Sequence, residues 1–184
     1  MLIRPIRPED REGLRAGIER LSLESRYRRF FSTALTLNSR HLRYLTEVDH
    51  RDHEALLAID PGTREGLAVA RYVRSGEDPR TAEVAVAVTD AWQRRGLGTL
   101  LLHDLTARAR EAGVERFSAS VLAENETMLD MLARLGGTHV IGREHGVIEL
   151  IMDLPESGIP DTLGSTVRAA ARGDVSLPPR PEER

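Results

Sequence analysis

One segment near the middle of the chain constrains the fold more than any other. Residues 81–98 have the sequence TAEVAVAVTDAWQRRGLG, in which an alternating run typical of a strand leads into a turn containing Gly96 and Gly98. A helical pattern begins directly afterwards. Glycine permits backbone angles that other residues avoid, and the following helix adds unpaired N–H groups and the positive end of its dipole. The segment therefore predicts an anion site, with a diphosphate as the expected ligand.

Two other phosphate-binding motifs do not fit this segment. A P-loop requires a lysine after its last glycine, and all 26 basic residues of this chain are arginine. A dinucleotide fingerprint needs three glycines and a parallel β-α-β setting, whereas the strands before this turn follow one another as a meander. A tight strand-to-helix turn without any ligand stays open as a purely structural alternative.

The rest of the chain has the pattern of one mixed α/β domain. Residues 2–6 suit an edge strand, because Pro5 cannot donate to a central ladder. Periodicity predicts further helices and strands in this order: helices over 8–21, 22–31 and 39–47, strands over 54–60, 66–74 and 81–88, a helix over 99–112, a strand over 117–121, a helix after Asn125, and strands over 138–143 and 147–154. The pattern fails after Leu154, so we expect a domain over 1–155 and a flexible tail containing proline and arginine over 156–184.

Composition narrows the partners and the chemistry. The net charge of −3 gives no reason to expect a nucleic-acid partner, and no apolar run approaches the roughly 18 residues of a membrane span. The first ten residues lack the apolar core of a secretory signal, so we expect a cytoplasmic protein. With no cysteine, thiolate chemistry and zinc–thiolate sites are excluded, and His50 with His53 is too weak a signal for a metal site. We therefore expect no metal.

The turn and its context resemble a known family. Gln93-Arg94-Arg95-Gly96-Leu97-Gly98 is similar to the Gln/Arg-x-x-Gly-x-Gly/Ala motif of the GCN5-related N-acetyltransferases (GNAT), which holds the pyrophosphate of coenzyme A. The order of elements also follows the family over residues 2–154. The resemblance implies an α/β (α+β) fold with a mixed, mostly antiparallel sheet of about six to seven strands flanked by helices, in which a splayed strand pair binds the cofactor.

The resemblance also implies roles for residues along the chain. Acetyl-CoA would be the acyl donor, and backbone groups of Val86 and Val88 would pair with its pantetheine arm like an added strand. Backbone N–H groups from Arg94 through Thr99 would hold the pyrophosphate. Asn125 would contact the pantetheine arm, and capping of the following helix is a compatible second role. Many members protonate the departing thiolate with a tyrosine where this chain has Leu132, which leaves that proton to water or another group.

A narrower resemblance concerns the acceptor. Residues 22–31 (SLESRYRRFF) and 48–56 (VDHRDHEAL) are similar to bacterial Pat-type protein lysine acetyltransferases. This implies that the acceptor is a lysine of another protein, such as an acyl-CoA synthetase. The structural alternative for 22–31 is an arginine-rich helix that covers core aromatic residues. A small-molecule amine acceptor, or a non-catalytic acyl-CoA-binding sensor, stays open as an alternative function, and the oligomeric state stays open as well.

Transfer to an amine requires a base, because amines are protonated at neutral pH. Glu83 is the candidate, since it lies between apolar residues on the strand before the turn, where we expect its carboxylate to be partly desolvated. The Pat-type resemblance places the catalytic glutamate in the same Ala-Glu-x-Ala strand, although a solvent-facing carboxylate is the alternative. His50, His53 and Glu54 are further candidates for the acceptor side. Without cysteine the amine would attack the thioester directly in a ternary complex.

Overall fold

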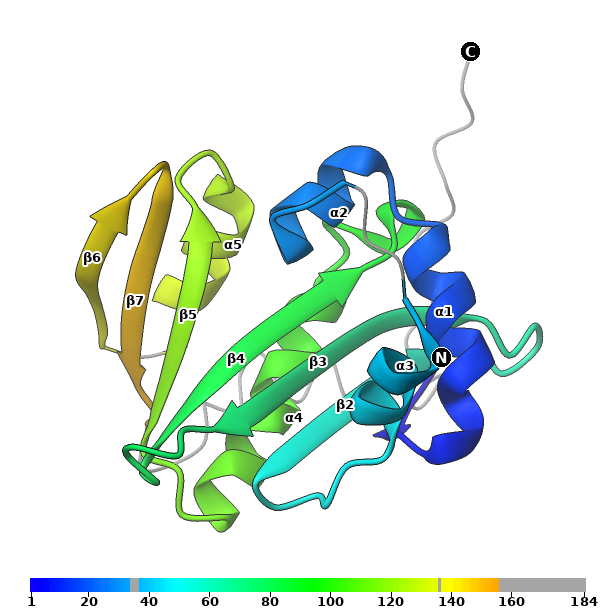
Figure 1. The fold of residues 1–184 in the computed structure, drawn as a ribbon, viewed down its shortest axis with the longest axis horizontal. Coiled ribbons are helices and arrows are strands. Elements are labelled where there is room, and N and C mark those ends of the chain that lie inside the picture. Colours follow the sequence, from blue (N-terminus) through cyan, green and yellow to red (C-terminus); the bar gives the residue numbers. More distant parts are fainter. Residues whose placement is uncertain (34–36, 136, 156–184) are drawn as a thin grey trace.

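A seven-stranded sheet in the order β1-β2-β3-β4-β5-β7-β6 organises the described part of the chain (Figure 1). The structure is a computed structural model that describes residues 1–33, 37–135 and 137–155. The tail expected over 156–184 lies outside the described residues. Neighbouring strands are antiparallel throughout, except that β4 and β5 are parallel. The expected mixed, mostly antiparallel sheet flanked by helices is confirmed.

The N-terminal half supplies four strands and three α-helices. Its elements are β1 (Leu2–Pro5), η1 (Pro8–Asp10), α1 (Arg11–Glu19), α2 (Leu23–Phe30), α3 (Ser39–Thr46), β2 (His53–Ile59), β3 (Gly66–Arg74) and β4 (Thr81–Val88). The expected meander of β2, β3 and β4 is confirmed, and β1 with Pro5 lies at the edge of the sheet.

The C-terminal half supplies the helix of the glycine turn and three more strands. Its elements are η2 (Asp90–Trp92), α4 (Leu97–Glu111), β5 (Arg116–Leu122), α5 (Glu126–Ala133), β6 (Thr138–Glu144) and β7 (Val147–Asp153). Helix α4 begins before the expected residue 99, because Gly96 adopts a left-handed conformation with φ of 77° and caps the helix. As a result Leu97 and Gly98 belong to its first turn.

Apolar side chains fill both faces of the sheet. The larger core contains Tyr72 and Phe117, both fully buried, together with the leucines of α4 and Leu132 of α5. The smaller core lies under α1, where Leu14 and Ile18 pack against residues of β2. In Figure 1, α4 lies behind the sheet and α1 and α3 lie in front of it. The helices therefore hold the middle of the sheet from both sides.

The sheet divides between β4 and β5. These strands pair only at Thr81–Arg116, Ala82–Phe117 and Glu83–Ser118, although β4 continues to Val88 and β5 to Leu122. Beyond these three pairs the ribbons diverge, with α2 near the end of β4 and α5 beside β5 (Figure 1). The expected splayed strand pair is therefore present.

Candidate active site

A cavity of about 650 Å³ lies where β4 and β5 separate. Such a volume is typical of a cofactor site. Its wall is built from α2, the end of β4, the glycine turn, the start of α4, and α5. The residues expected to hold the coenzyme line it, with the exception of Arg95: Val86, Val88, Gln93, Arg94, Gly96, Leu97, Gly98, Thr99 and Asn125.

The backbone at the end of β4 faces the divided side of the sheet. Antiparallel strands alternate positions whose backbone groups bond the partner with positions whose groups point away from it. The N–H of Thr89 donates to the carbonyl of Leu67 on the β3 side at 2.9 Å, and Val88 is opposite Ala68 in this register. Val86 and Val88 therefore direct their N–H and C=O groups away from β3, toward the space that β5 has left.

The glycine turn brings several unpaired N–H groups to the same cavity. Arg94 and Gly96 both have positive φ, 58° and 77°, which bends the chain sharply before α4. The N–H groups of the first turn of a helix have no partner within the helix. A Cβ atom on Gly98 would lie 3.1 Å from Sδ of Met131 and 3.5 Å from Cγ2 of Val88, so glycine permits close packing here. The arrangement suits a diphosphate.

Two residues of the motif have side-chain partners within the protein. Nε2 of Gln93 donates to the carbonyl of Val88 at 3.1 Å and to Oγ of Ser25 at 2.9 Å. The guanidinium of Arg95 lies over the Trp92 ring, 5.2 Å from its centroid, and Arg95 does not line the cavity. The sequence suggested positive charge from both arginines at the rim, but the structure places only Arg94 there.

Asn125 combines the two roles that the sequence left open. Its Oδ1 accepts from the N–H of Met128 at 3.3 Å and caps α5. The residue is 8% exposed and also lines the cavity. Since the cap uses the side-chain oxygen, the amide N–H groups of Asn125 remain available to a ligand.

Glu83 lines a second, smaller cavity of about 50 Å³ next to the first. Arg28, Arg29, Val86, Asn125 and Met128 line both cavities, so the two adjoin. Glu83 is the last residue of β4 that pairs with β5, and its side chain is exposed. The expectation that it is partly desolvated is wrong, because it lies on the face opposite α4, outside the larger core.

The small cavity also contains groups that the sequence did not single out. Ser120 of β5 and Phe31 line it together with Leu132, which occupies the position of the family's tyrosine. By register Ser118 is opposite Glu83, so Ser120 lies one pleat further along the same face. The alternating serines of β5 are a sequence signal that could have indicated this second polar wall.

The arginines of α2 lie in three different surroundings. Arg26 donates to the carbonyl of Glu19, and Arg28 pairs with Glu24 at 2.5 Å. The guanidinium of Arg29 lies 4.9 Å from the Phe30 ring centroid. Burial lowers the pKa of Arg29, while the negative charge of Glu83 opposes this shift. Arg28 and Arg29 therefore bring positive charge to the wall beside Glu83.

The three other acceptor-side candidates lie elsewhere. Glu54 is 1% exposed, and its carboxylate accepts from Arg108 of α4 at 3.0 Å and contacts His50 at 2.8 Å. Nε2 of His53 lies 3.1 Å from Arg71, and neither His53, His50 nor Glu54 lines the two cavities. These residues join β2 to α4 and to β3. Across residues 1–33, 37–135 and 137–155 no cluster of side chains suits a metal ion.

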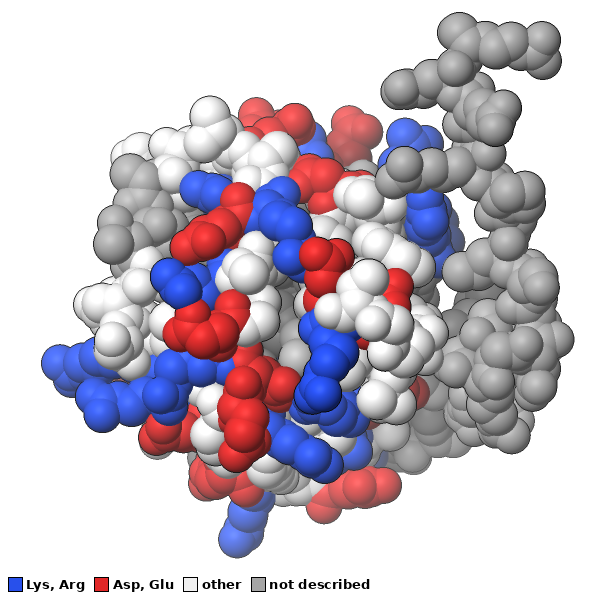
Figure 2. Space-filling view, turned by 90° about the vertical axis from the view of Figure 1, so that its right-hand side faces the viewer, with Lys and Arg blue, Asp and Glu red and all other residues white. Residues whose placement is uncertain are grey.

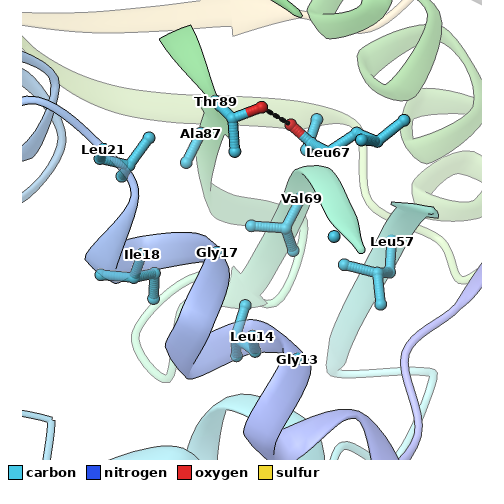
Figure 3. Close-up of a pocket in the computed structure, with 12 residues that line it drawn as sticks. Gly13, Leu14, Gly17, Ile18, Leu21, Leu57, Leu67, Val69, Ala87 and Thr89 are labelled. Atoms are coloured by element: carbon cyan, nitrogen blue, oxygen red, sulfur yellow. Dashed lines mark hydrogen bonds between the residues drawn. The ribbon is translucent and has the colours of Figure 1, made fainter. Parts of the chain in front are cut away.

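A third cavity, between α1 and β3, is too small for a coenzyme. Its volume is about 20 Å³, and Figure 3 shows Leu14, Ile18 and Val69 around it. The one hydrogen bond drawn there runs from Oγ1 of Thr89 to the carbonyl of Leu67 at 3.0 Å. It is a packing gap beside the smaller core.

The surface charge and the helices were also compared with what nucleic-acid-binding and membrane-spanning proteins require. On the face that carries α1, Figure 2 shows basic and acidic side chains interspersed, without a large region of one sign. Among the described residues, no helix is both long and apolar enough to span a bilayer.

Comparisons with known proteins agree with this geometry. The sequence profile of the Acetyltransferase (GNAT) family matches residues 20–137. The chain is 37% identical to acetyltransferase Pat of Mycolicibacterium smegmatis over 83% of its own length, but it spans only 45% of that relative. It is 32% identical to an acetyltransferase of Pseudomonas aeruginosa over 74% of each chain. The crystal structure of the GNAT domain of S. lividans PAT matches with a TM-score of 0.75 and 36% identity, over 83% of this chain and 89% of that one.

Proposed function

Since the chain belongs to the acetyltransferase (GNAT) family, we propose that it is an N-acetyltransferase that transfers acetyl from acetyl-CoA to a lysine of another protein. The observation that carries this proposal is the division of the sheet after Glu83. It leaves a cavity of coenzyme size on one side of the split and a carboxylate at its base.

Acetyl-CoA would occupy the larger cavity as an added strand. The outward backbone groups of Val86 and Val88 suit the amides of a pantetheine arm. The N–H groups from Arg94 to Thr99 suit the pyrophosphate, and the amide of Asn125 suits the arm from the opposite wall. The thioester then lies where β4 and β5 diverge, near Glu83.

Glu83 would act as the base in a direct transfer. Its carboxylate takes a proton from the lysine ammonium, and the neutral amine attacks the thioester carbonyl carbon. A backbone N–H that β4 directs into the split stabilises the resulting oxyanion. The C–S bond then breaks, and the second proton of the attacking nitrogen passes through water to the departing thiolate, because Leu132 has none to give. Glu83 returns its own proton to solvent. A thiol-linked acyl-enzyme cannot form, since the chain has no cysteine.

A protein acceptor is favoured by the similarity to Pat and by the surface of α2. Leu23, Tyr27 and Phe31 follow one another at helical spacing and are 65%, 42% and 42% exposed. Phe31 also lines the Glu83 cavity. Exposed apolar residues beside an active-site opening are typical of a protein-binding surface. An acceptor with an apolar residue near its target lysine suits this surface.

The test is transfer from acetyl-CoA to a purified acyl-CoA synthetase and to a panel of small amines, read by mass spectrometry. The chain has no lysine, so every acetyl-lysine must lie on the acceptor. We expect Glu83→Gln to reduce the rate roughly 10²–10⁴-fold with coenzyme affinity nearly intact, because it removes the proton acceptor and keeps the shape.

Glu149→Gln is the matched control. Glu149 is also exposed and lies on the same face of the sheet, on β7, but lines neither cavity. Its variant should transfer acetyl at the native rate. Equal rates for Glu83→Gln and Glu149→Gln would eliminate Glu83 as the base, and modification of small amines alone would eliminate the protein acceptor.

A further inference from the structure

A carboxylate next to the coenzyme turn holds the first turn of α2. Oδ2 of Asp90 accepts from the N–H of Ser22 at 2.9 Å. Its Oδ1 accepts from the hydroxyls of Ser22 and Ser25, each at 2.8 Å. Burial alone would raise the pKa of Asp90, but these hydrogen bonds outweigh it and hold the pKa below its ordinary value. The ionised carboxylate is thus the form that this contact selects.

Gln93 extends the same network to β4. Its Nε2 donates to Oγ of Ser25 and to the carbonyl of Val88. Val88 is the last residue of β4 at the split, and Gln93 opens the coenzyme motif. One continuous set of hydrogen bonds therefore joins α2, the turn and the divided end of the sheet.

Capping of α2 does not require this carboxylate. The N–H of Ser25 already donates to Oγ of Ser22 at 3.1 Å, which is the usual side-chain cap. Asp90 instead binds the capping residue itself from another element. The bond is therefore tertiary, between α2 and the turn.

In helix α2 the apolar contact lies at the C-terminal end, where the partly buried Phe30 packs against the smaller core. All residues from Leu23 to Phe30 are described, and none of them is fully buried. Apolar burial normally sets where a helix lies on a domain. At the N-terminal end the contact that holds α2 is polar, through Asp90. Arg28 and Arg29 lie at the other end, about 10 Å along the axis, and line both cavities.

We propose that Asp90 is a positioning residue, which holds α2 against the coenzyme turn so that Arg28, Arg29 and Phe31 form the acceptor wall beside Glu83. This inference rests on the proposed function for the meaning of that wall. The contact of Asp90 with α2 can be measured without any enzymatic activity. Asp90 itself lines neither cavity, so its effect on transfer is exerted through α2.

The experiment compares Asp90→Ala and Ser25→Ala with the native protein by hydrogen exchange of residues 24–30, without ligand. We expect exchange in α2 to rise about tenfold in Asp90→Ala, the loss expected for a charge-assisted hydrogen bond, while α4 is unchanged. Asp60→Ala is the control, because Asp60 is a carboxylate that accepts from Gly62 and Thr63 within its own turn. Unchanged exchange in α2 would overturn the proposal.

Kinetics then separate positioning from coenzyme binding. Trp92 lines the larger cavity and is the only tryptophan, so its fluorescence reports acetyl-CoA affinity. In Asp90→Ala we expect kcat/KM for the acceptor to fall about tenfold while acetyl-CoA affinity changes less than about threefold. In the double variant Asp90→Ala/Ser25→Ala, kcat/KM for the acceptor should be no lower than in Asp90→Ala alone, because both side chains belong to one hydrogen-bond network. Additive losses, or a loss confined to coenzyme affinity, would contradict the inference. A native protein that transfers to no amine would refute the proposed function and leave the exchange result standing.

Discussion

His53 is a histidine whose surroundings exclude its charged form. Burial lowers its pKa from 6.5 to about 4, and the neighbouring Arg71 adds to the shift. Nε2 of the ring lies 3.1 Å from that guanidinium, and the Tyr44 ring lies 5.0 Å away, centroid to centroid. The folded protein therefore holds this ring neutral under conditions in which the unfolded chain binds a proton.

This difference predicts a pH-dependent stability. Between pH 6.5 and about 4 the unfolded state binds more protons at this site, so the free energy of unfolding falls as pH decreases through that window. His53→Gln has no proton to gain, and its amide oxygen can still accept from Arg71. We expect its Tm to fall less than the native Tm between pH 7 and pH 4.5. His139→Gln is the control at an exposed position, and its Tm should fall with pH like the native Tm. An equal fall of Tm in the native protein and in both variants would contradict the pKa shift at His53.

Single residues also differ in how well their surroundings could be predicted from the sequence. The motif residues could be grouped at one wall of a cavity because they belong to a single turn. The surroundings of Glu83 and Glu54 could not be predicted, because they depend on which face of the sheet a helix covers. Glu83 faces the opening and is exposed, whereas Glu54 lies under α4 and pairs with Arg108. Both residues belong to strands that look similar in sequence.

Among the elements, α4 packs unusually close to its neighbours at its first turn. The space at Gly98 is bounded by Met131 of α5 and Val88 of β4. We expect Gly98→Leu to abolish acetyl-CoA binding, since the side chain would fill the space between the turn and the end of β4. Gly98→Ala should weaken binding less, because the flexible Met131 side chain can shift. Fluorescence of Trp92 during titration with acetyl-CoA measures both effects.

Gly76→Leu is the control for that comparison. Gly76 lies in the exposed loop between β3 and β4, and a Cβ atom there would meet no atom within 4 Å. Its variant should bind acetyl-CoA like the native protein. Native affinity in Gly98→Leu would mean that the diphosphate is bound elsewhere.

The elements themselves could largely be predicted, because apolar periodicity is a local property. Strands β3 and β4 have the bounds that the sequence indicated, and α4 differs only where Gly96 changes the start of the helix. The helix over 22–31 was also indicated, but what holds it was not. Ser22, Ser25 and Asp90 meet across a separation of more than sixty residues. No spacing along the chain reveals such a contact.

At the scale of the whole molecule, the two parts of the sheet share only three residue pairs. A coenzyme bound in the split would join them through its own hydrogen bonds. A ligand that binds only the folded state stabilises it by mass action. We therefore expect acetyl-CoA to raise the Tm and to slow amide exchange at residues 84–88 and 119–122 together.

Hydrogen exchange with and without acetyl-CoA measures this directly. Residues 55–58 of β2 provide an internal control, because they are buried in the sheet away from the split. Their exchange should change only as far as global stability changes. Protection limited to the glycine turn, with β4 and β5 unaffected, would show that the coenzyme does not bridge the split.

The three-pair joint between β4 and β5 has a consequence for how long a molecule survives. Whenever the split is empty, two strands present unpaired backbone to their surroundings, and such edges invite association with other chains and attack by proteases. Bound acetyl-CoA would then also stabilise the protein that consumes it. Under scarcity of acetyl-CoA the population of intact molecules would shrink, and under abundance it would grow. Through this joint, the amount of intact protein would follow the supply of acetyl-CoA.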